Sequence, residues 1–402
     1  MERQILFDLR PAYYDDFHCL AAGCQQSCCV GWRIAFDKKD YLSLKRQSGS
    51  QDLNTRMEHG LQRIRSGDPL ETKDYGEFAM KGGRCPLLRE DCLCALQLEK
   101  GHDALPYVCR NFPRIGSYQP SGYLERSLSP ACEAVLKLLW ELPEGVDFRS
   151  GPLPKIQHQN VAWEDPCSLM SYFQEIRSRC IDILQNRRYP LPKRILMMGL
   201  LLKELAEGEK DVSRWLARTQ SIQKDTMLPE TESTQALPMF LSRNFLVLLS
   251  LKNSNPQITD IPTQVTDSLG FKFRPETAKA IMPTASYLAA RECFTAKFSG
   301  HEYFMENLMV AIFFHLHLPD LSSLEALWKS YVNFCNLYSF CRFLSVLSCR
   351  EGVIDNRTEL FRLLVFASRS LLHNHLRQTT LRDNLFQNDS ATLAHMAILL
   401  SG

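Results

Sequence analysis

Four cysteines lie within eleven positions of the segment HCLAAGCQQSCCVGW, residues 18–32. The 402-residue chain contains fifteen cysteines in all, and nine of them lie within residues 19–132. Thiolates bind zinc and iron–sulfur clusters, and turn-rich backbone such as KGGRCP can direct successive sulfurs toward one point. The clustering therefore predicts a thiolate-bound metal site, weighed against the alternative of unrelated buried thiols.

The spacing of the cysteines does not identify the metal that they would bind. The pattern begins Cys19-x4-Cys24-x3-Cys28-Cys29, and after a 55-residue gap it continues with Cys85, Cys92, Cys94, Cys109 and Cys132. It contains no C-x2-C pair of the kind that structural zinc sites favour, and it lacks both ferredoxin spacings. Zinc and an iron–sulfur cluster both stay open at this point. Disulfides are not expected if the chain is cytosolic.

Five ordered pieces of sequence carry a resemblance to a known family. They are C-x4-C-x3-CC-x2-W, CPL, C-x-C, CRNFPR and ERSLSPAC. Together they resemble the flagellin lysine-N-methylase family over about residues 10–135, and that family shares its cysteine pattern with small bacterial zinc- or iron-chelating domains. The resemblance implies methyl transfer from S-adenosylmethionine to the ε-amino groups of flagellin lysines. It also implies a [4Fe-4S] cluster held by the cysteine motif.

Eight cysteines fall within this motif by position. They are Cys19, Cys24, Cys28, Cys29, Cys85, Cys94, Cys109 and Cys132. One cluster takes four thiolates, and the resemblance does not say which four of the eight bind. Cys92 is the extra cysteine of the segment.

A lysine ammonium must lose a proton before it can attack a methyl sulfonium. Acidic or phenolic side chains beside the cysteines are therefore candidates for the base, namely Tyr107, Glu125 and Glu133. For each of them, packing or capping is the competing interpretation.

Three further side chains are candidates for binding the cofactor. Arg110 and Arg114 could bind the methionine carboxylate of S-adenosylmethionine in bidentate fashion, with an ordinary salt bridge as the alternative. Trp32 could shield a cluster from water or stack on adenine, with core packing as the alternative. The chain lacks the Gly-rich turn of a Rossmann-type site, so cofactor binding of an unconventional kind is expected.

These residues must be positioned by two regions of different character. Residues 1–145 are irregular and cysteine-rich, residues 144–160 predict a linker, and residues 161–402 predict an all-helical region, so the expected fold class is mainly α. The helical region is expected to recognise the substrate. Candidate helices are Lys38–Gln47, Gln51–Arg65, Ala131–Leu142, Cys167–Asn186, Leu191–Ala206, Leu237–Leu251, Pro275–Phe298, His301–Leu316, Leu321–Ser348 (as one helix or two), Asp355–Asn374 and Ser390–Leu400, with loops at 220–236 and 252–270.

Composition narrows the class of protein. The net charge of +2, from 47 basic and 45 acidic residues, gives no electrostatic argument for nucleic acid. No signal peptide or membrane-spanning run is predicted. The expected location is the cytoplasm, with peripheral membrane contact left open. The alternatives to an enzyme are a non-catalytic zinc- or iron-binding interaction module and a redox or metal-transfer protein.

Overall fold

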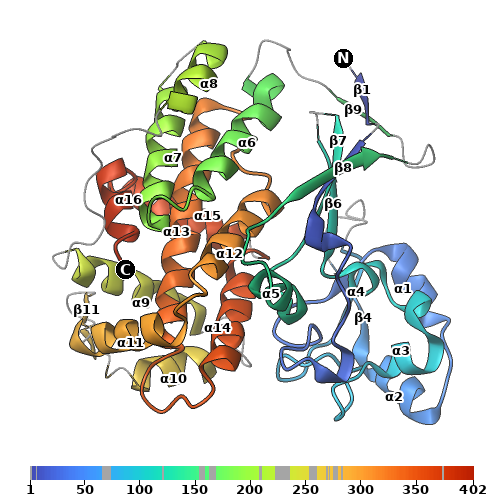
Figure 1. Cartoon of the computed structure of the whole chain (residues 1–402). Helices are drawn as coiled ribbons and strands as arrows, with labels where there is room; N and C mark the ends of the chain where they lie inside the picture. Colours follow the sequence, from blue (N-terminus) through green and yellow to red (C-terminus); the bar gives the residue numbers. More distant parts are fainter. Residues whose placement is uncertain are drawn as a thin grey trace.

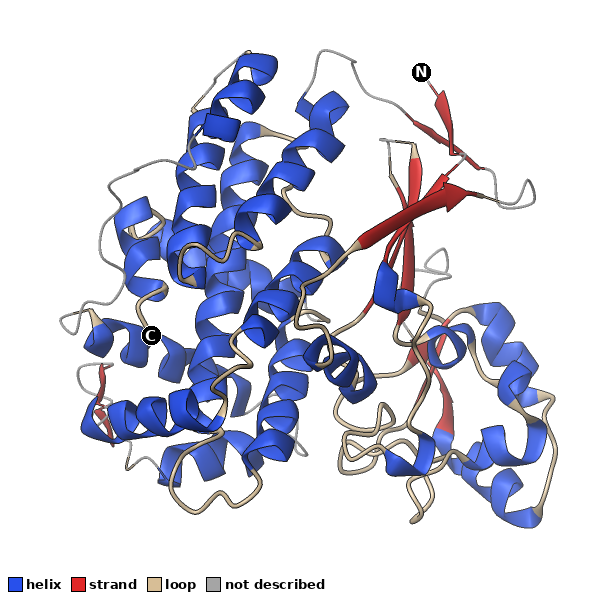
Figure 2. Cartoon of the chain, in the orientation of Figure 1, coloured by secondary structure: helices blue, strands red, loops and turns tan. Residues whose placement is uncertain are grey.

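The computed structural model describes most of the chain. Residues outside the description are 1, 6, 66–73, 120–121, 154–158, 163–168, 208–210, 222–235, 253–259, 269, 271, 275–278, 282–283 and 374. Helices dominate the described residues, which confirms the mainly α class (Figures 1 and 2). None of the described helices has the length and apolar character that crossing a membrane requires.

A small N-terminal subdomain carries Cys85, Cys92, Cys94 and Cys109. Its sheet has the order β3-β5-β4, and short helices surround it (Figure 1). The elements are α1 Lys38–Lys45, α2 Gln51–Gly60, α3 Ala95–Lys100, α4 Tyr107–Asn111, β3 Ala35–Phe36, β4 Leu61–Arg63 and β5 Gly76–Phe78. The helix expected over Gln51–Arg65 ends at Gly60, because Leu61 is extended and residues 61–63 pair with β5 as strand β4. A core of its own holds this subdomain together, and that core includes Cys85.

A four-stranded sheet joins the subdomain to the helices, with the order β6-β7-β2-β8. Its strands are β2 Phe7–Pro11, β6 Arg114–Tyr118, β7 Tyr123–Leu128 and β8 Phe148–Pro152; separately, β1 Glu2–Ile5 pairs with β9 Gln159–Ala162. Strand β2 runs parallel to β7 and antiparallel to β8. The linker prediction is therefore wrong for 148–152, since ladder hydrogen bonds to β2 fix this segment in the sheet.

Helix α5, Glu133–Trp140, connects the N-terminal half to the main hydrophobic core. Leu136 and Leu139 on α5 are fully buried, and they belong to the same hydrophobic cluster as the helices that follow. The helix contacts α12 and α14. Its position places the cysteine loops against the helical region (Figure 1). The division at residues 145 and 161 stays a prediction.

The second half of the chain is a packed helical array. Its elements are α6 Phe173–Leu184, α7 Leu191–Ala206, α8 Val212–Ser221, α9 Leu237–Lys252, α10 Asp260–Ser268, α11 Thr284–Lys297, α12 Tyr303–His315, α13 Leu324–Leu347, α14 Asn356–Leu371, α15 His375–Gln387 and α16 Leu393–Leu399, with a hairpin of β10 Lys272–Arg274 and β11 Lys279–Ile281. The central α13 is one helix, and the side chain of Ser323 caps it by accepting the Ala326 N–H at 3.0 Å.

Several local expectations for this half need correction. Helix α10 lies in the segment 252–270 that was expected to be a loop, and α15 was not expected at all. The hairpin contradicts the all-helical expectation, because β11 occupies part of the helix expected from Pro275. By contrast, the helix expected at Leu191–Ala206 is α7 with the same bounds.

Candidate metal centre

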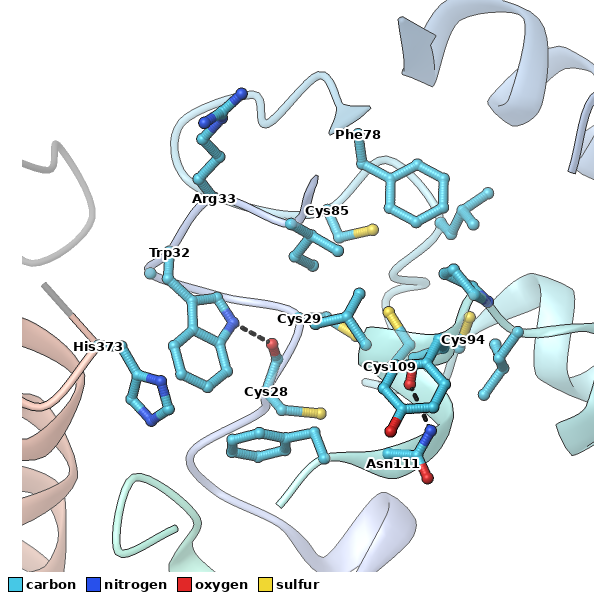
Figure 3. A pocket seen from close by; sticks show the side chains of 18 of the residues that line it. Cys28, Cys29, Trp32, Arg33, Phe78, Cys85, Cys94, Cys109, Asn111 and His373 are labelled. Carbon is cyan, nitrogen blue, oxygen red and sulfur yellow. Dashed lines mark hydrogen bonds between the residues drawn. The ribbon is translucent and has the colours of Figure 1, made fainter. Parts of the chain in front are cut away.

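A cavity of about 610 Å³ lies where the N-terminal subdomain meets the helical region. Five of the eight motif cysteines line it, and Figure 3 shows their sulfurs around one space. They are Cys28, Cys29, Cys85, Cys94 and Cys109. Segments that lie up to 81 positions apart (109 − 28) thus contribute thiols to a single wall.

Backbone pairing between two loops brings these thiols together. The Cys85 N–H donates to the carbonyl of Cys29 at 2.9 Å, and the Gly31 N–H donates to the carbonyl of Gly83 at 2.9 Å. Gly83 has a φ of 71°, a conformation that glycine adopts without steric cost, so the turn before Cys85 can close. Cys94 is the N-cap residue of α3, and Cys109 lies on α4.

The sulfurs are close enough to perturb one another. The thiol of Cys29 forms hydrogen bonds with Cys28, which lowers its pKa, and with Cys85, which raises it; together with burial they leave the pKa of Cys29 at about 12. Burial first, and then the neighbouring Cys29 and Cys28, raise the pKa of Cys109 well above its ordinary value. Deprotonating several of these thiols together is therefore unfavourable without a cation among them.

The donor set discriminates between kinds of metal group. Among the residues that the structure describes, no three His, Cys, Asp or Glu side chains are arranged to hold a single metal ion. Sulfurs around one zinc would lie about 3.8 Å apart, from tetrahedral Zn–S bonds of about 2.3 Å. A multi-iron cluster spaces its thiolates more widely, and cysteine is its usual ligand. Five thiols in the wall of one cavity are a donor set that such a cluster can take.

The other three motif cysteines lie outside the wall of the cavity. They are Cys19, Cys24 and Cys132. The Sγ of Cys24 lies 3.7 Å from Oε2 of Glu133. Burial first, and then the Glu133 charge, raise the pKa of Cys24 to about 12. The structure therefore divides the eight motif cysteines into five at the cavity and three beside it.

Glu133 holds the cysteine loop in place. Although it is only 4% exposed, its Oε2 accepts the N–H groups of Gln25 and Gln26 at 2.8 and 2.9 Å. Lys137, one turn further along α5, lies 2.9 Å from Oε1. All of these contacts are directed at the loop and at α5, and Glu133 does not line the cavity.

Arg369 of α14 fixes the same loop from the other side, and the sequence analysis missed it. Its guanidinium donates to the carbonyls of Gln26, Ser27 and Val30 at 2.6, 3.1 and 3.0 Å, and to that of Ala131 at 3.2 Å. It is 8% exposed, and no carboxylate pairs with it among the described residues. A buried cation thus lies beside the cysteines, where negative thiolates would compensate its charge.

An aromatic group closes one side of the cavity. The Trp32 indole donates to the Cys28 carbonyl at 2.7 Å, and its ring meets those of Phe112 and His373 edge-on, both at 4.8 Å (Figure 3). His373 also lines the cavity, and sequence analysis did not select it as a site residue. The helix expected to run to Asn374 ends at Leu371, and this end leaves His373 at the cavity.

The candidates for cofactor binding are placed differently. Trp32 and Arg114 line the cavity, whereas Arg110 does not. Arg114 stacks on Phe17 with its guanidinium carbon 4.7 Å from the ring centroid. Arg110 donates to the carbonyl of Asp103 at 3.2 Å.

Of the candidates for the base, one lines the cavity and the others do not. Tyr107 lines the cavity and is 66% exposed, which places it at the entrance. Glu125 on β7 is 1% exposed, lies outside the wall and pairs with Arg177, His317 and Gln174. Although burial alone raises the pKa of Glu125, hydrogen bonding from His317 and the charge of Arg177 lower it below its ordinary value.

The molecule is thus a mainly helical protein with a cavity lined by five thiols between its two halves. Residues 177–399, more than half of the chain, match the family model of the FliB lysine N-methylase C-terminal domain. The chain therefore belongs to the FliB lysine N-methylase family. This confirms the family indicated by the sequence motifs.

Curated relatives match a shorter stretch. The chain is 30% identical over 141 residues to a lysine-N-methylase of Salmonella typhimurium and 29% identical over 140 residues to one of Salmonella choleraesuis. Each match covers 34% of this chain and 33% of the relative. The flagellar biosynthetic protein FliU of Salmonella muenchen is 29% identical over 140 residues, covering 34% of this chain and 78% of FliU. No solved structure matches the chain.

Proposed function

We propose that the protein is a protein-lysine N-methyltransferase that transfers methyl groups from S-adenosylmethionine to flagellin lysines in the cytoplasm. We further propose that it depends on a [4Fe-4S] cluster in the five-cysteine cavity. Membership of the lysine N-methylase family supports the methylation chemistry. The convergence of five thiols on one cavity is the observation that carries the cofactor proposal.

Five cavity thiols are one more than a cluster bound by four cysteines takes, and two more than a cluster with one open iron takes. A cluster with an open iron supplies a redox-active Lewis-acid position that can bind the amine and carboxylate of S-adenosylmethionine. We assign the ligands to the five cavity cysteines, with Cys19, Cys24 and Cys132 supporting the loop. Cys92, which is exposed and outside the wall, is not a ligand.

The chain's own residues would bind, orient and shield. Trp32 and Phe112 cover Cys28 and exclude water from this side of the cavity. Arg114 lies in the wall, where a guanidinium can bind a carboxylate in bidentate fashion. Tyr107 is at the entrance, where the target amine must pass, and in its phenolate form it is the proposed acceptor of the lysine proton.

The test is iron and acid-labile sulfide content after anaerobic purification of the wild type and single Cys→Ala variants. Replacement of a ligand among the five cavity cysteines should abolish the cluster and methylation together. Cys92→Ala is the matched control, because it removes a thiol from the same segment as Cys94. Full iron content in every cavity variant would overturn the assignment of ligands.

Activity is tested separately by adding S-adenosylmethionine and flagellin to the iron-loaded protein. Methyl groups on flagellin lysines, found by mass spectrometry, are expected. An iron-loaded protein that leaves flagellin unmodified would contradict the enzymatic function. A colourless zinc protein without activity would identify the non-catalytic interaction module instead.

A further inference from the structure

A second cavity, of about 800 Å³, lies in the helical half away from the cysteines. Residues of α5, α11, α12 and α13 and of the segment 400–402 contribute to its wall. None of the cysteines lines it. We call it the arginine pocket, after its five arginines Arg187, Arg188, Arg194, Arg291 and Arg342.

Positive charge in this pocket exceeds negative charge. Only two acidic residues, Glu302 and Glu306, join the five arginines in the wall. Glu306 is 1% exposed and is shared by two of the arginines, with Arg187 at 2.9 Å and Arg194 at 2.6 Å. Two guanidinium groups thus compete for one carboxylate, and a net positive charge is left.

Three of the arginines, Arg188, Arg291 and Arg342, form no salt bridge with an acidic side chain within the described part of the chain, and Arg342 instead donates to the carbonyl of Gly402 at 3.1 Å. Arg188 is exposed and Arg291 is half-buried. Cationic side chains gathered around one cavity repel one another unless an anion binds between them. The uncompensated charge therefore indicates an anionic ligand.

Buried polar atoms in the wall also lack partners. Nε of Arg194 and Nδ1 of His301 are both buried with no hydrogen-bond partner. Arg194 as a whole is only 7% exposed, so no bulk water satisfies its Nε. A buried donor without a partner costs free energy, which a ligand acceptor would recover. This observation is independent of the charge count.

Aromatic rings accompany the arginines. Trp140 stacks on His301 with ring centroids 4.3 Å apart, and the guanidinium of Arg342 lies 5.2 Å from the ring of Phe294. Tryptophan, tyrosine and arginine dominate the binding energy of protein–protein interfaces. Such a wall suits a peptide segment with acidic and apolar side chains better than it suits a free inorganic anion.

We propose that the arginine pocket binds an acidic segment of the protein substrate. This inference rests on the proposed function, because it supplies that function with a docking site for the protein that carries the target lysines. Helix α5 runs from the cysteine loops to the arginine pocket: Trp140 at its end lines the pocket, and its N-cap residue is Cys132, one of the three motif cysteines beside the cysteine cavity. Eight residues of helix separate Trp140 from Cys132 by about 12 Å along the axis.

Calorimetric titration of the full-length protein with a glutamate oligopeptide tests the pocket without any need for activity. The wild type should bind this peptide, more weakly at higher salt, and should not bind a glutamine oligopeptide. The double variant Arg188→Glu/Arg291→Glu should bind about ten-fold more weakly or worse, because both charges are reversed. The matched control is Arg214→Glu, which reverses an exposed charge on α8 outside the pocket.

The outcomes separate this inference from the proposed function. Equal peptide binding by the wild type and the double variant, or tighter binding of inorganic phosphate than of the peptide, would overturn the docking site. In methylation assays, the double variant should raise KM for flagellin and leave kcat for a short lysine peptide unchanged. Absence of methylation by every form would contradict the enzyme, while the peptide titration would still decide the pocket. Circular dichroism of each variant verifies its fold.

Discussion

Arg369 on α14 donates a hydrogen bond from Nη2 to the carbonyl oxygen of Gln26 at 2.6 Å, across 343 positions of sequence. The same guanidinium reaches Ser27 and Val30, which bracket the cysteine pair of this loop. The conformation of the Cys28–Cys29 segment therefore depends on a residue at the other end of the chain. The helical half is a structural part of the cysteine site.

Replacing Arg369 by Met should lower the free energy of unfolding by about 3 kcal/mol, because several buried carbonyls lose their donor. The stability of Arg369→Lys should lie between those of the wild type and Arg369→Met, since an ammonium cannot reach all of the carbonyls at once. Urea denaturation measures the change. Arg149→Met, at a side chain that is 63% exposed, should change stability by less than about 0.5 kcal/mol. Equal stability of the two Met variants would contradict the role of Arg369.

Glu125→Gln tests whether this carboxylate stabilises the fold. Its Oε2 lies 2.8 Å from Nη1 of Arg177, which is 1% exposed, so the variant leaves a buried cation without its counter-charge. We expect a loss of about 3 kcal/mol in the free energy of unfolding. Glu141→Gln, at a side chain 71% exposed, is the control. Undiminished stability together with a large loss of kcat would instead make Glu125 a catalytic residue.

His315 makes stability depend on pH. Burial first, and then the nearby His373 and His317, lower the pKa of His315 from 6.5 to about 3. Because the unfolded chain takes up this proton near pH 6.5 and the folded chain does not, stability falls as pH falls below 6.5. Through His315, the free energy of unfolding should be about 2 kcal/mol lower at pH 5 than at pH 7.

Denaturant unfolding at pH 7, 6 and 5 measures this dependence. His315→Gln should reduce the slope without abolishing it, because burial also lowers the pKa of His373 to about 4, whereas His59→Gln, at an exposed histidine of α2, should leave it unchanged. The measurements stay above pH 4.5 because paired carboxylates such as Glu125 lose their contribution to stability only at lower pH. An unchanged slope in His315→Gln would count against a neutral buried histidine.

Gly199 tests the packing of α7 against α13. A Cβ at this position would lie 2.1 Å from Cζ of Tyr331. Gly199→Ala should therefore destabilise the protein by about 1–3 kcal/mol, although alanine is the better helix former. In a Tyr331→Ala background the same change should cost much less, and a double-mutant cycle measures the difference. Additive effects would exclude the steric conflict.

The sequence by itself determined the local elements and the chemistry of the site. Apolar residues at helical spacing with clear end signals predicted α7 with its bounds, because such signals lie within a few residues of each other. The cysteine motif likewise predicted a thiol-rich site and the family. Segments with weaker local signals, such as α10 and β8, were missed, because β8 is held by pairing with the distant β2.

Only the tertiary structure decided how the eight motif cysteines divide into five at the cavity and three beside it. Spacing cannot show this, because Cys85 meets Cys29 through a backbone pair between two loops. The positions of Arg369 and His373 at the cavity, and the arginine pocket, could not be predicted from the sequence for the same reason. Each of them lies where segments far apart in sequence meet, and long-range packing, which no local pattern encodes, brings those segments together.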